Sequence, residues 1–174
     1  MDVLGVRVEM PTNQPIVLLR ERGGRRYLPI WIGAAEASAI AYAQQGVVPP
    51  RPLTHDLMAT LIEQLGHRLS KVRITALTDG AFHAVLVLDS DGDQIATEVD
   101  SRSSDAIALA LRTGATIEAD EDLLDEVGVH MDEEGAESDG DDEAPSEDVL
   151  AEFKEFLDNV SPEDFETDEP PAQS

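Results

Sequence analysis

The chain has 174 residues, no cysteine and a formal net charge of −25. This length leaves room for one domain and a tail, and the lack of cysteine excludes disulfides and thiolate metal sites. No apolar run approaches the roughly 18 residues of a membrane helix, and the first residues lack the charged and apolar regions of a signal peptide. We therefore expect a cytoplasmic protein that does not contact a membrane.

The acidity is concentrated in the C-terminal third. Residues 1–117 hold 11 Lys and Arg against 13 Asp and Glu, a net charge of −2. Residues 118–174 hold one Lys against 24 Asp and Glu, a net charge of −23. The first part is nearly neutral and has room for a local basic patch, whereas the acidic part repels nucleic acid at low salt.

The first 32 residues predict three strands. Strand-forming residues fill segments 3–8, 16–19 and 26–32, and Gly23-Gly24 predicts a hairpin between the last two. Pro29 removes a backbone donor from the third strand, so we expect that strand at an edge or bulged.

A strand-to-helix junction follows. Gly33 is expected to open a helix over 34–45, in which the charge of Glu36 suits the helix dipole. A capping role for Glu36 is favoured over a role as a metal ligand beside Asp56. Trp31 is expected in the core.

The next helix is the clearest in the chain. Thr54 is a good N-cap for a helix over 55–65, and Gly66 suits its end. Five apolar residues have the spacing of one buried stripe: Leu57, Met58, Leu61, Ile62 and Leu65.

Residues 71–99 alternate in the manner of an antiparallel meander, with turns at 78–80 and 89–93. A helix over 104–112 then starts near Ser103, and its apolar residues on nearly every side predict that it is buried. Residues 116–117 suit a last short strand. These elements predict an α+β fold, a mostly antiparallel mixed sheet with two to three packed helices.

The C-terminal region divides by composition. We expect a folded domain over residues 1–128, an acidic disordered linker over 129–148, and a short amphipathic helix with a disordered end over 149–174. A single helix of that length is marginal, so it is expected to dock on its own domain or on a protein partner. An edge strand and a buried Ala-rich helix also favour a homodimer.

The segment Arg51-Pro-Leu-Thr-His-Asp56 admits two interpretations. In the first, it only starts a helix, with Thr54 as cap and Asp56 favouring the dipole. In the second, Arg51 binds phosphate and His55 or Asp56 acts as acid/base or metal ligand. The first interpretation leaves Arg51 and His55 unexplained.

The segment Asp100-Ser-Arg-Ser-Ser-Asp105 at the start of the third helix is equally ambiguous. Arg102 lies between two aspartates, which makes a buried ion pair easy to form. The same carboxylates are hard oxygen ligands that could hold a divalent cation beside a bound phosphate.

One further basic cluster lies at the expected hairpin tip and consists of Arg20, Arg22, Arg25 and Arg26. Such a tip is usually solvated, although it could follow a nucleic-acid backbone. No aromatic residues interleave it, so it offers no platform for stacking bases.

Three segments in this order, Leu28–Ala37, Arg51–Asp56 and Asp100–Arg112, resemble the bifunctional nuclease domain family. The resemblance covers roughly residues 1–128. The family's usual third motif has Pro directly after the Arg, whereas this chain has Ser103 at that position. Pro and Ser are both acceptable near a helix start.

The resemblance implies a nuclease that hydrolyses RNA and DNA without marked sequence preference. At the motif positions we expect the groups that contact substrate to be Arg51, Arg102, Thr54 and Ser104. The expected acid/base or metal-ligand groups are His55, Asp56, Asp100 and Asp105. Asp100, Asp105 and Glu36 are the candidate ligands for a divalent cation such as Mg or Mn.

Two other interpretations stay open. In one, the chain is a non-catalytic module whose Arg and Asp motifs bind a small anion or form an interaction surface. In the other, these motifs lock the fold through buried ion pairs, and replacing Arg51 or Arg102 would unfold the protein.

Overall fold

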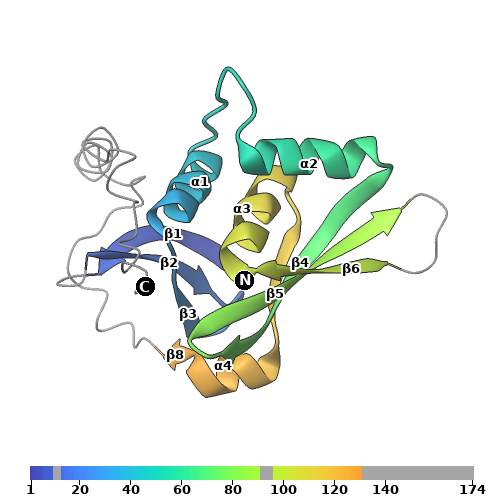
Figure 1. Cartoon of the computed structure of the whole chain (residues 1–174). Coiled ribbons are helices and arrows are strands. Elements are labelled where there is room, and N and C mark those ends of the chain that lie inside the picture. The colour runs from blue at the N-terminus through green and yellow to red at the C-terminus, as the bar shows by residue number, and fades with distance from the viewer. Residues whose placement is uncertain (10–12, 91–95, 131–174) are drawn as a thin grey trace, which may run out of the picture. The chain divides into compact units, whose positions relative to one another are not determined.

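The computed structural model describes residues 1–9, 13–90 and 96–130 (Figure 1). Over these residues the chain forms eight strands and four helices. The N-terminal elements are β1 (Asp2–Glu9), β2 (Gln14–Arg20), β3 (Arg26–Trp31), α1 (Ala34–Gln44) and α2 (Thr54–Gln64). The remaining elements are β4 (His67–Thr78), β5 (Ala81–Ser90), β6 (Thr97–Arg102), α3 (Ser103–Thr113), β7 (Thr116–Ala119), α4 (Glu121–Val127) and β8 (Val129–His130).

The described strands form two sheets of four. The first has the order β1-β2-β3-β8 and is antiparallel throughout. The second has the order β6-β5-β4-β7, in which only β4 and β7 run parallel. The α+β class and the mostly antiparallel character are therefore confirmed, with the strands divided between two sheets and a fourth helix added.

Helix α3 lies at the centre of the core. It contacts α1, α2, β4 and β5, and five consecutive residues, Ala106 to Ala110, are at most 1% exposed. The small side chains of Ala106, Ala108 and Ala110 let neighbouring elements approach closely, which explains why an Ala-rich segment becomes the most buried of the described helices. Gly114 ends the helix with φ of 72°, a left-handed conformation that suits glycine.

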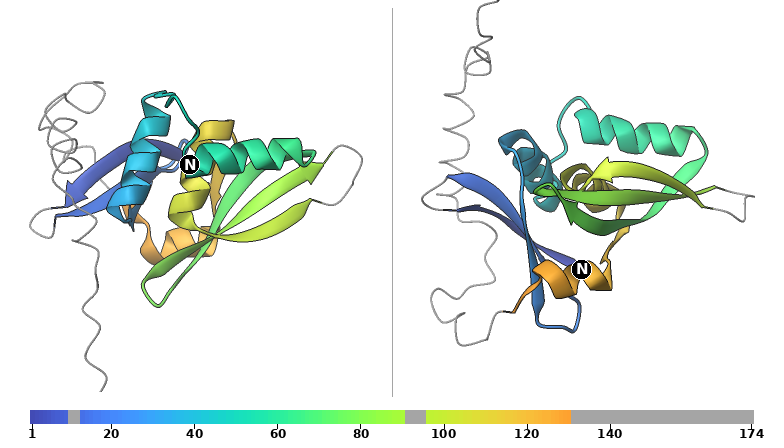
Figure 2. Two further views of the ribbon diagram at one scale, coloured as in Figure 1. Left: turned by 45° about the horizontal axis from the view of Figure 1, so that its top comes forward. Right: turned by 60° about the horizontal axis from the view of Figure 1, so that its bottom comes forward.

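One apolar core joins both sheets to this helix. Its fully buried large side chains come from β2, β3, α1, β4 and α3. They are Val17, Leu19, Leu28, Ile30, Ile40, Val72, Ile74, Ile107 and Leu109. Figure 2 shows from two further sides how α3 is enclosed between α1, α2 and the second sheet. The buried third helix predicted from the sequence is confirmed.

Strand β3 pairs with β2 along its length and with β8 only at Arg26 and Tyr27. Pro29 therefore lies where β3 has no second described strand beside it. This agrees with the edge position expected for a residue that lacks a backbone donor.

Helix α2 differs from the sequence prediction in two respects. Leu53 occupies the N-cap position and Thr54 is the first helical residue, so the prediction of Thr54 as cap is wrong. The backbone N–H of Leu53 donates instead to the Asp56 carboxylate at 2.9 Å. The single buried stripe is also wrong, because Leu57, Leu61 and Leu65 are exposed.

Trp31 and α4 were not anticipated correctly. The Trp31 side chain is 50% exposed, and its indole N–H donates to Glu9 at 2.9 Å, so the prediction of a core position is wrong. Helix α4 fills the segment after β7, where no helix was predicted, and buries Leu123 and Leu124.

Strand β8 pairs with β3 and extends the first sheet to His130, two residues past the expected domain boundary at residue 128. The rest of the predicted linker and the predicted helix over 149–160 lie outside the described residues. Within the described part of the chain, no helix is long and apolar enough to span a membrane.

Candidate functional site

The best candidate site lies where three helices meet. Strand β6 ends at Arg102, which takes the N-cap position of α3, and Asp105 follows in the first turn of that helix. His55 is near the start of α2, and Glu36 is in the first turn of α1. Contacts of α3 with α1 and α2 bring these segments, distant in sequence, to one place.

Arg102 holds the centre of this cluster. Its Nε donates to Asp105 Oδ2 at 2.7 Å and its Nη2 to Asp105 Oδ1 at 3.1 Å, a two-point contact. Its Nη1 lies 2.8 Å from Glu36 Oε1. A guanidinium has five N–H groups, so these three contacts leave two N–H groups that can donate to another molecule. The Arg102 side chain is 65% exposed, which leaves this fixed cation open to solvent.

His55 contacts the same carboxylate from the other side. Its Nε2 lies 2.9 Å from Asp105 Oδ1, and its side chain is 11% exposed. Asp105 thus bridges a guanidinium and an imidazole. In proteins, a carboxylate in this position fixes the orientation and tautomer of the ring.

A second cluster lies beside the first and is more enclosed. Arg112 Nε donates to Asp56 Oδ1 at 2.6 Å, and Arg112 Nη1 donates to the carbonyls of Ala39 and Ala108 at 2.9 and 3.0 Å. The Arg112 side chain is only 9% exposed. This arginine therefore ties α1, α2 and α3 together, which is a structural task.

Both aspartates have lowered pKa values. Burial alone would raise the pKa of Asp105, but hydrogen bonds from Arg102 and His55 outweigh it and hold that pKa below its ordinary value. Burial likewise opposes the shift at Asp56, where hydrogen bonds from Arg112 and the Leu53 N–H lower the pKa. The Asp105 carboxylate in turn raises the pKa of Arg102.

These shifts predict an acid-sensitive fold. A carboxyl whose pKa is lower in the folded state stabilises the protein fully above its unfolded pKa, about 4. That contribution disappears as the pH falls through the folded pKa. We expect the urea midpoint to fall steeply below pH ~4, and to fall less steeply in Asp56→Asn and Asp105→Asn. Equal slopes for the parent and both variants would contradict the assignment.

The structure brings together only some of the residues predicted from sequence. His55, Asp105, Arg102 and Glu36 form one cluster, and the ion pair of Asp105 with Arg102 is present as expected. Ser104 is buried beside them in the first turn of α3. Asp56 belongs to the separate cluster of Arg112.

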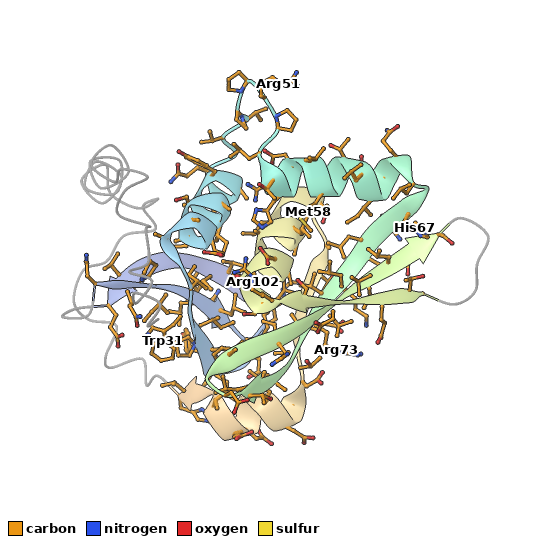
Figure 3. The ribbon with its side chains drawn as sticks, in the orientation of Figure 1. Trp31, Arg51, Met58, His67, Arg73 and Arg102 are labelled. Atoms are coloured by element: carbon orange, nitrogen blue, oxygen red, sulfur yellow. The ribbon has the colours of Figure 1, made fainter. Side chains whose placement is uncertain are left out.

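Three predicted residues lie elsewhere. Arg51 is exposed at the tip of the loop before α2, well away from Arg102 (Figure 3). Thr54 is exposed and makes no cap hydrogen bond. Asp100 is in register with Val85 in the second sheet, whereas its neighbour Val99 is in register with the core residue Leu86. By strand alternation Asp100 lies on the same face of β6 as Arg102, but it forms no hydrogen bond or ion pair with any described residue.

The residues present do not fit a divalent cation. No three His, Cys, Asp or Glu side chains come together among the described residues in a way that could hold a metal. Of the expected ligands, Glu36 and Asp105 both bind the Arg102 guanidinium, and Asp100 forms no hydrogen bond or ion pair with any described residue.

The predicted basic hairpin tip is neutralised in part. Arg26 contacts Glu21, Glu121 and Asp125, each at 2.7 Å, and Arg22 contacts Asp2 at the same distance. Arg20 and Arg25 are exposed and form no ion pair with a described residue. Through Arg26 the tip also links β3 to α4.

Arg112 is the residue that sequence reasoning missed. In the sequence it is only the last residue of the third motif. A cation in the final turn of a buried apolar helix has few routes to solvent, and this was the available signal for a buried partner.

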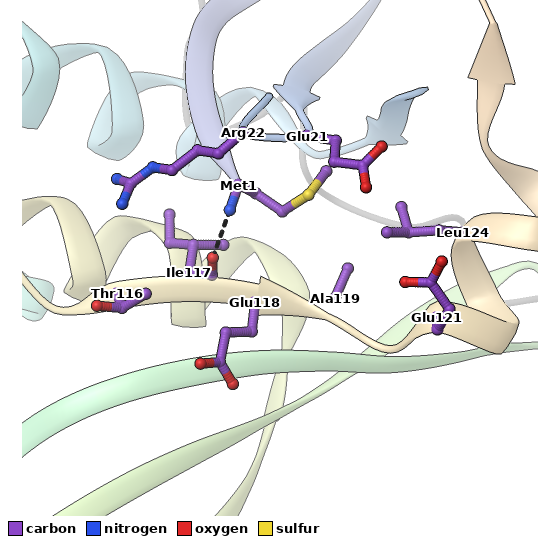
Figure 4. A pocket seen from close by; sticks show the side chains of 9 residues that line it. All are labelled: Met1, Glu21, Arg22, Thr116, Ile117, Glu118, Ala119, Glu121 and Leu124. Carbon is purple, nitrogen blue, oxygen red and sulfur yellow. Dashed lines mark hydrogen bonds between the residues drawn. The ribbon is translucent and has the colours of Figure 1, made fainter. Parts of the chain in front are cut away.

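A pocket of about 260 Å³ lies away from both clusters (Figure 4). Residues of the N-terminus, β7 and α4 line it, and the Met1 amine donates to the Ile117 carbonyl at 2.6 Å beside it. Neither this pocket nor a neighbouring one of about 310 Å³ includes a residue of the clusters.

Comparison with known proteins identifies the family. The model of the bifunctional nuclease domain matches residues 17–132. An uncharacterized protein of Mycobacterium tuberculosis is 51% identical over 166 residues, which cover 94% of this chain and 95% of that protein.

Plant proteins resemble the same region more distantly. Bifunctional nuclease 1 of Oryza sativa subsp. indica is 30% identical over 117 residues, or 67% of this chain and 35% of that protein. Bifunctional nuclease 2 of Arabidopsis thaliana is 28% identical over 124 residues, or 71% of this chain and 38% of that protein. The matched region contains every member of both clusters, and the chain belongs to the bifunctional nuclease domain family.

Proposed function

We propose that this chain is a nuclease that hydrolyses phosphodiester bonds of RNA and DNA. Family membership and the names of the distant plant relatives support the activity. The observation that carries the proposal is the Arg102 guanidinium, which two carboxylates hold in place while 65% of its side chain remains exposed. It lies beside an imidazole that a carboxylate has already oriented.

Arg102 supplies the phosphate contact in this proposal. Its two remaining N–H groups suit two oxygens of one phosphate, because guanidinium and phosphate match in charge and geometry. The first turn of α3 adds backbone N–H groups and the positive end of the helix dipole. Asp105 already holds the Arg102 guanidinium in place, so binding of substrate does not have to order that side chain.

His55 is the proposed acid/base group. Hydrolysis requires a water oxygen to bond to phosphorus while the bond from phosphorus to the leaving oxygen breaks. One proton must leave the water and one must reach the leaving oxygen, and imidazole is suited to such transfers near neutral pH. Because only 11% of its side chain is exposed, contact with substrate is confined to one edge of the ring.

The test is hydrolysis of labelled single-stranded RNA and DNA by the full-length chain, with Mg or Mn and with EDTA. We expect cleavage by the parent protein and a loss of about 100-fold in Arg102→Ala, as for removal of one preorganised charge-stabilising group. Arg68→Ala is the matched control, because Arg68 is also an exposed arginine paired with an aspartate. Cleavage that survives in folded Arg102→Ala would refute the proposal.

One observation favours a second candidate function. The Asp105 carboxylate contacts both Arg102 and His55, so the cluster also suits a structural lock between α2 and α3. In a non-catalytic module, the exposed part of Arg102 would bind a small anion. Salt-dependent binding of nucleic acid is required of the nuclease but not of this module, so it separates the two.

A further inference from the structure

The first sheet carries an exposed aromatic residue to which the proposed site gives no role. Trp31, at the end of β3, is 50% exposed, and its indole N–H donates to Glu9 of β1 at 2.9 Å. This hydrogen bond holds the edge of the ring in place while half of the residue stays open to solvent. A ring held in this way suits stacking, because little side-chain entropy is left to lose when a flat ligand binds.

The register of the sheet places an arginine in the same row. Val17 and Ile30 are a cross-strand pair of core residues. The next pair along the two strands, Ile16 and Trp31, faces away from the core, because strand residues alternate between faces. Arg7 of β1 is in register with Ile16. Arg7 and Trp31 therefore lie on one outer face, two strand spacings or about 10 Å apart.

A second row repeats this arrangement. Arg20 is in register with Tyr27, and each lies four residues along its strand from the first row, so both are on the same face. Arg20 is exposed and Tyr27 is half-buried. The rows are about 13 Å apart, the length of roughly four stacked nucleotides at about 3.4 Å each. These residues come from three strands, so only the folded sheet brings them to one face.

The free charge on this face is positive. Arg7 and Arg20 are exposed and form no hydrogen bond or ion pair with a described residue. Of the carboxylates in the described part of this face, Asp2 is paired with Arg22 at 2.7 Å and Glu9 accepts the indole N–H. Free guanidinium groups beside aromatic rings are the chemistry that binds a single nucleic-acid strand, with phosphates at the cations and bases on the rings.

We propose that this outer-sheet face, defined by Arg7, Arg20, Tyr27 and Trp31, binds a single strand of RNA or DNA. A base stacks on Trp31, and the two arginines contact phosphates. A duplex fits less well, because its bases are stacked on one another and offer no free ring face inside the helix. The inference rests on the proposed function in one respect only, that the bound strand continues to Arg102.

The outer-sheet face adjoins Arg102 through the junction of β3 and α1. The Glu36 carboxylate folds back over Gly33 and occupies the space that a side chain there would need. The same carboxylate contacts Arg102 at 2.8 Å. Figure 3 shows Trp31 at the first sheet and Arg102 at the start of α3. Because Trp31 is two residues before Gly33, its Cα lies within about 17 Å of the Arg102 guanidinium. One strand of a few nucleotides can reach both.

Tryptophan fluorescence gives a direct test, because Trp31 is the only tryptophan in the chain. The probe is an oligothymidylate of about 15 nucleotides, titrated into the full-length chain and checked afterwards for cleavage. We expect saturable quenching by the stacked base, with an affinity that falls as salt rises. No quenching up to about 100 µM oligonucleotide, or quenching that salt does not weaken, would overturn the proposal.

Arginine variants test the phosphate contacts. Arg7→Ala and Arg20→Ala should each weaken binding about threefold or more and reduce the salt slope by about 0.7, the value for one phosphate on a single strand. Both side chains are exposed and unpaired among the described residues, so these variants are expected to fold. Arg68→Ala changes an exposed arginine of the second sheet and should keep the parental slope. An unchanged slope in either variant, or an equal fall in the control, would refute the arrangement.

Cleavage kinetics separate this subsite from the proposed nuclease activity. Trp31→Ala should raise KM about tenfold for a strand of about 15 nucleotides, with the effect on KM rather than on kcat, and Trp31→Phe should recover most of the loss. A dinucleotide is too short to reach from Arg102 to Trp31, so its KM should change much less. Cleavage by the parent without quenching would refute the subsite and leave the nuclease. Quenching without cleavage would support the subsite and refute the nuclease.

Discussion

Arg112→Met is expected to lower the free energy of unfolding by about 3 kcal/mol, the largest loss of any single change to a charged residue here. The substitution keeps an unbranched chain of similar reach but removes the partner of Asp56 and the donor to Ala39 and Ala108. A carboxylate that is only 27% exposed is then left without its cation. Urea unfolding at pH 7, followed by circular dichroism, measures the change.

Arg68→Met is the matched control for this prediction. Arg68 is 77% exposed and its contact with Asp89 is 3.4 Å long, so its removal should change stability by less than about 0.5 kcal/mol. If the two variants lose equal stability, the cluster around Arg112 does not tie the helices in the manner described.

Asp105→Asn is expected to lower the rate of phosphodiester hydrolysis by about 100-fold, a prediction that rests on the proposed nuclease activity. The amide is nearly the same size as the carboxylate, but it cannot hold Arg102 through two charged contacts and no longer presents a carboxylate to orient the His55 ring. The measurement is the initial rate of cleavage of labelled RNA, with folding checked by circular dichroism.

Asp100→Asn is the informative comparison, because both aspartates belong to one sequence motif. Asp100 forms no hydrogen bond or ion pair with any described residue, so its variant should cut RNA at the parental rate. Equal loss in both variants would show that the motif acts as a unit and that the separation seen in the structure does not hold during catalysis.

Sequence patterns predicted the structure best where the burial of each residue depends on the pattern of a single helix or strand. The apolar residues of α3 predict a buried helix because every face of that segment is apolar, and the structure buries it. Alternation in 71–90 likewise predicts β4 and β5, whose inward residues include Val72 and Leu86.

The same patterns do not say what covers an apolar face. In α2, Met58 packs on the core while Leu57 and Leu61 face outward, although all five apolar residues fit helical spacing. A broad apolar arc on a helix predicts contact, but whether its own domain or another molecule makes that contact depends on tertiary packing. The exposed position of Trp31 has the same cause.

Only the local part of the candidate site could be predicted from the sequence. Arg102 and Asp105 are three residues apart at a helix start, so their ion pair follows from local geometry. His55 and Glu36 join them only through packing of α1 and α2 on α3, and no local spacing encodes that packing. Asp100 is in β6 and Asp105 is in α3, so a shared motif does not by itself bring the two carboxylates into one cluster.

The alanines of α3 also bear on how freely this chain can change over evolution. Ala106, Ala108 and Ala110 are at most 1% exposed, and elements pack on the helix from several sides. One added methylene there forces side chains off their rotamers or moves a neighbouring helix, at a cost of about 1–3 kcal/mol. Such a movement would displace Arg102 and Asp105 relative to His55 and Glu36. Positions far from solvent therefore limit which surface chemistries the chain can acquire.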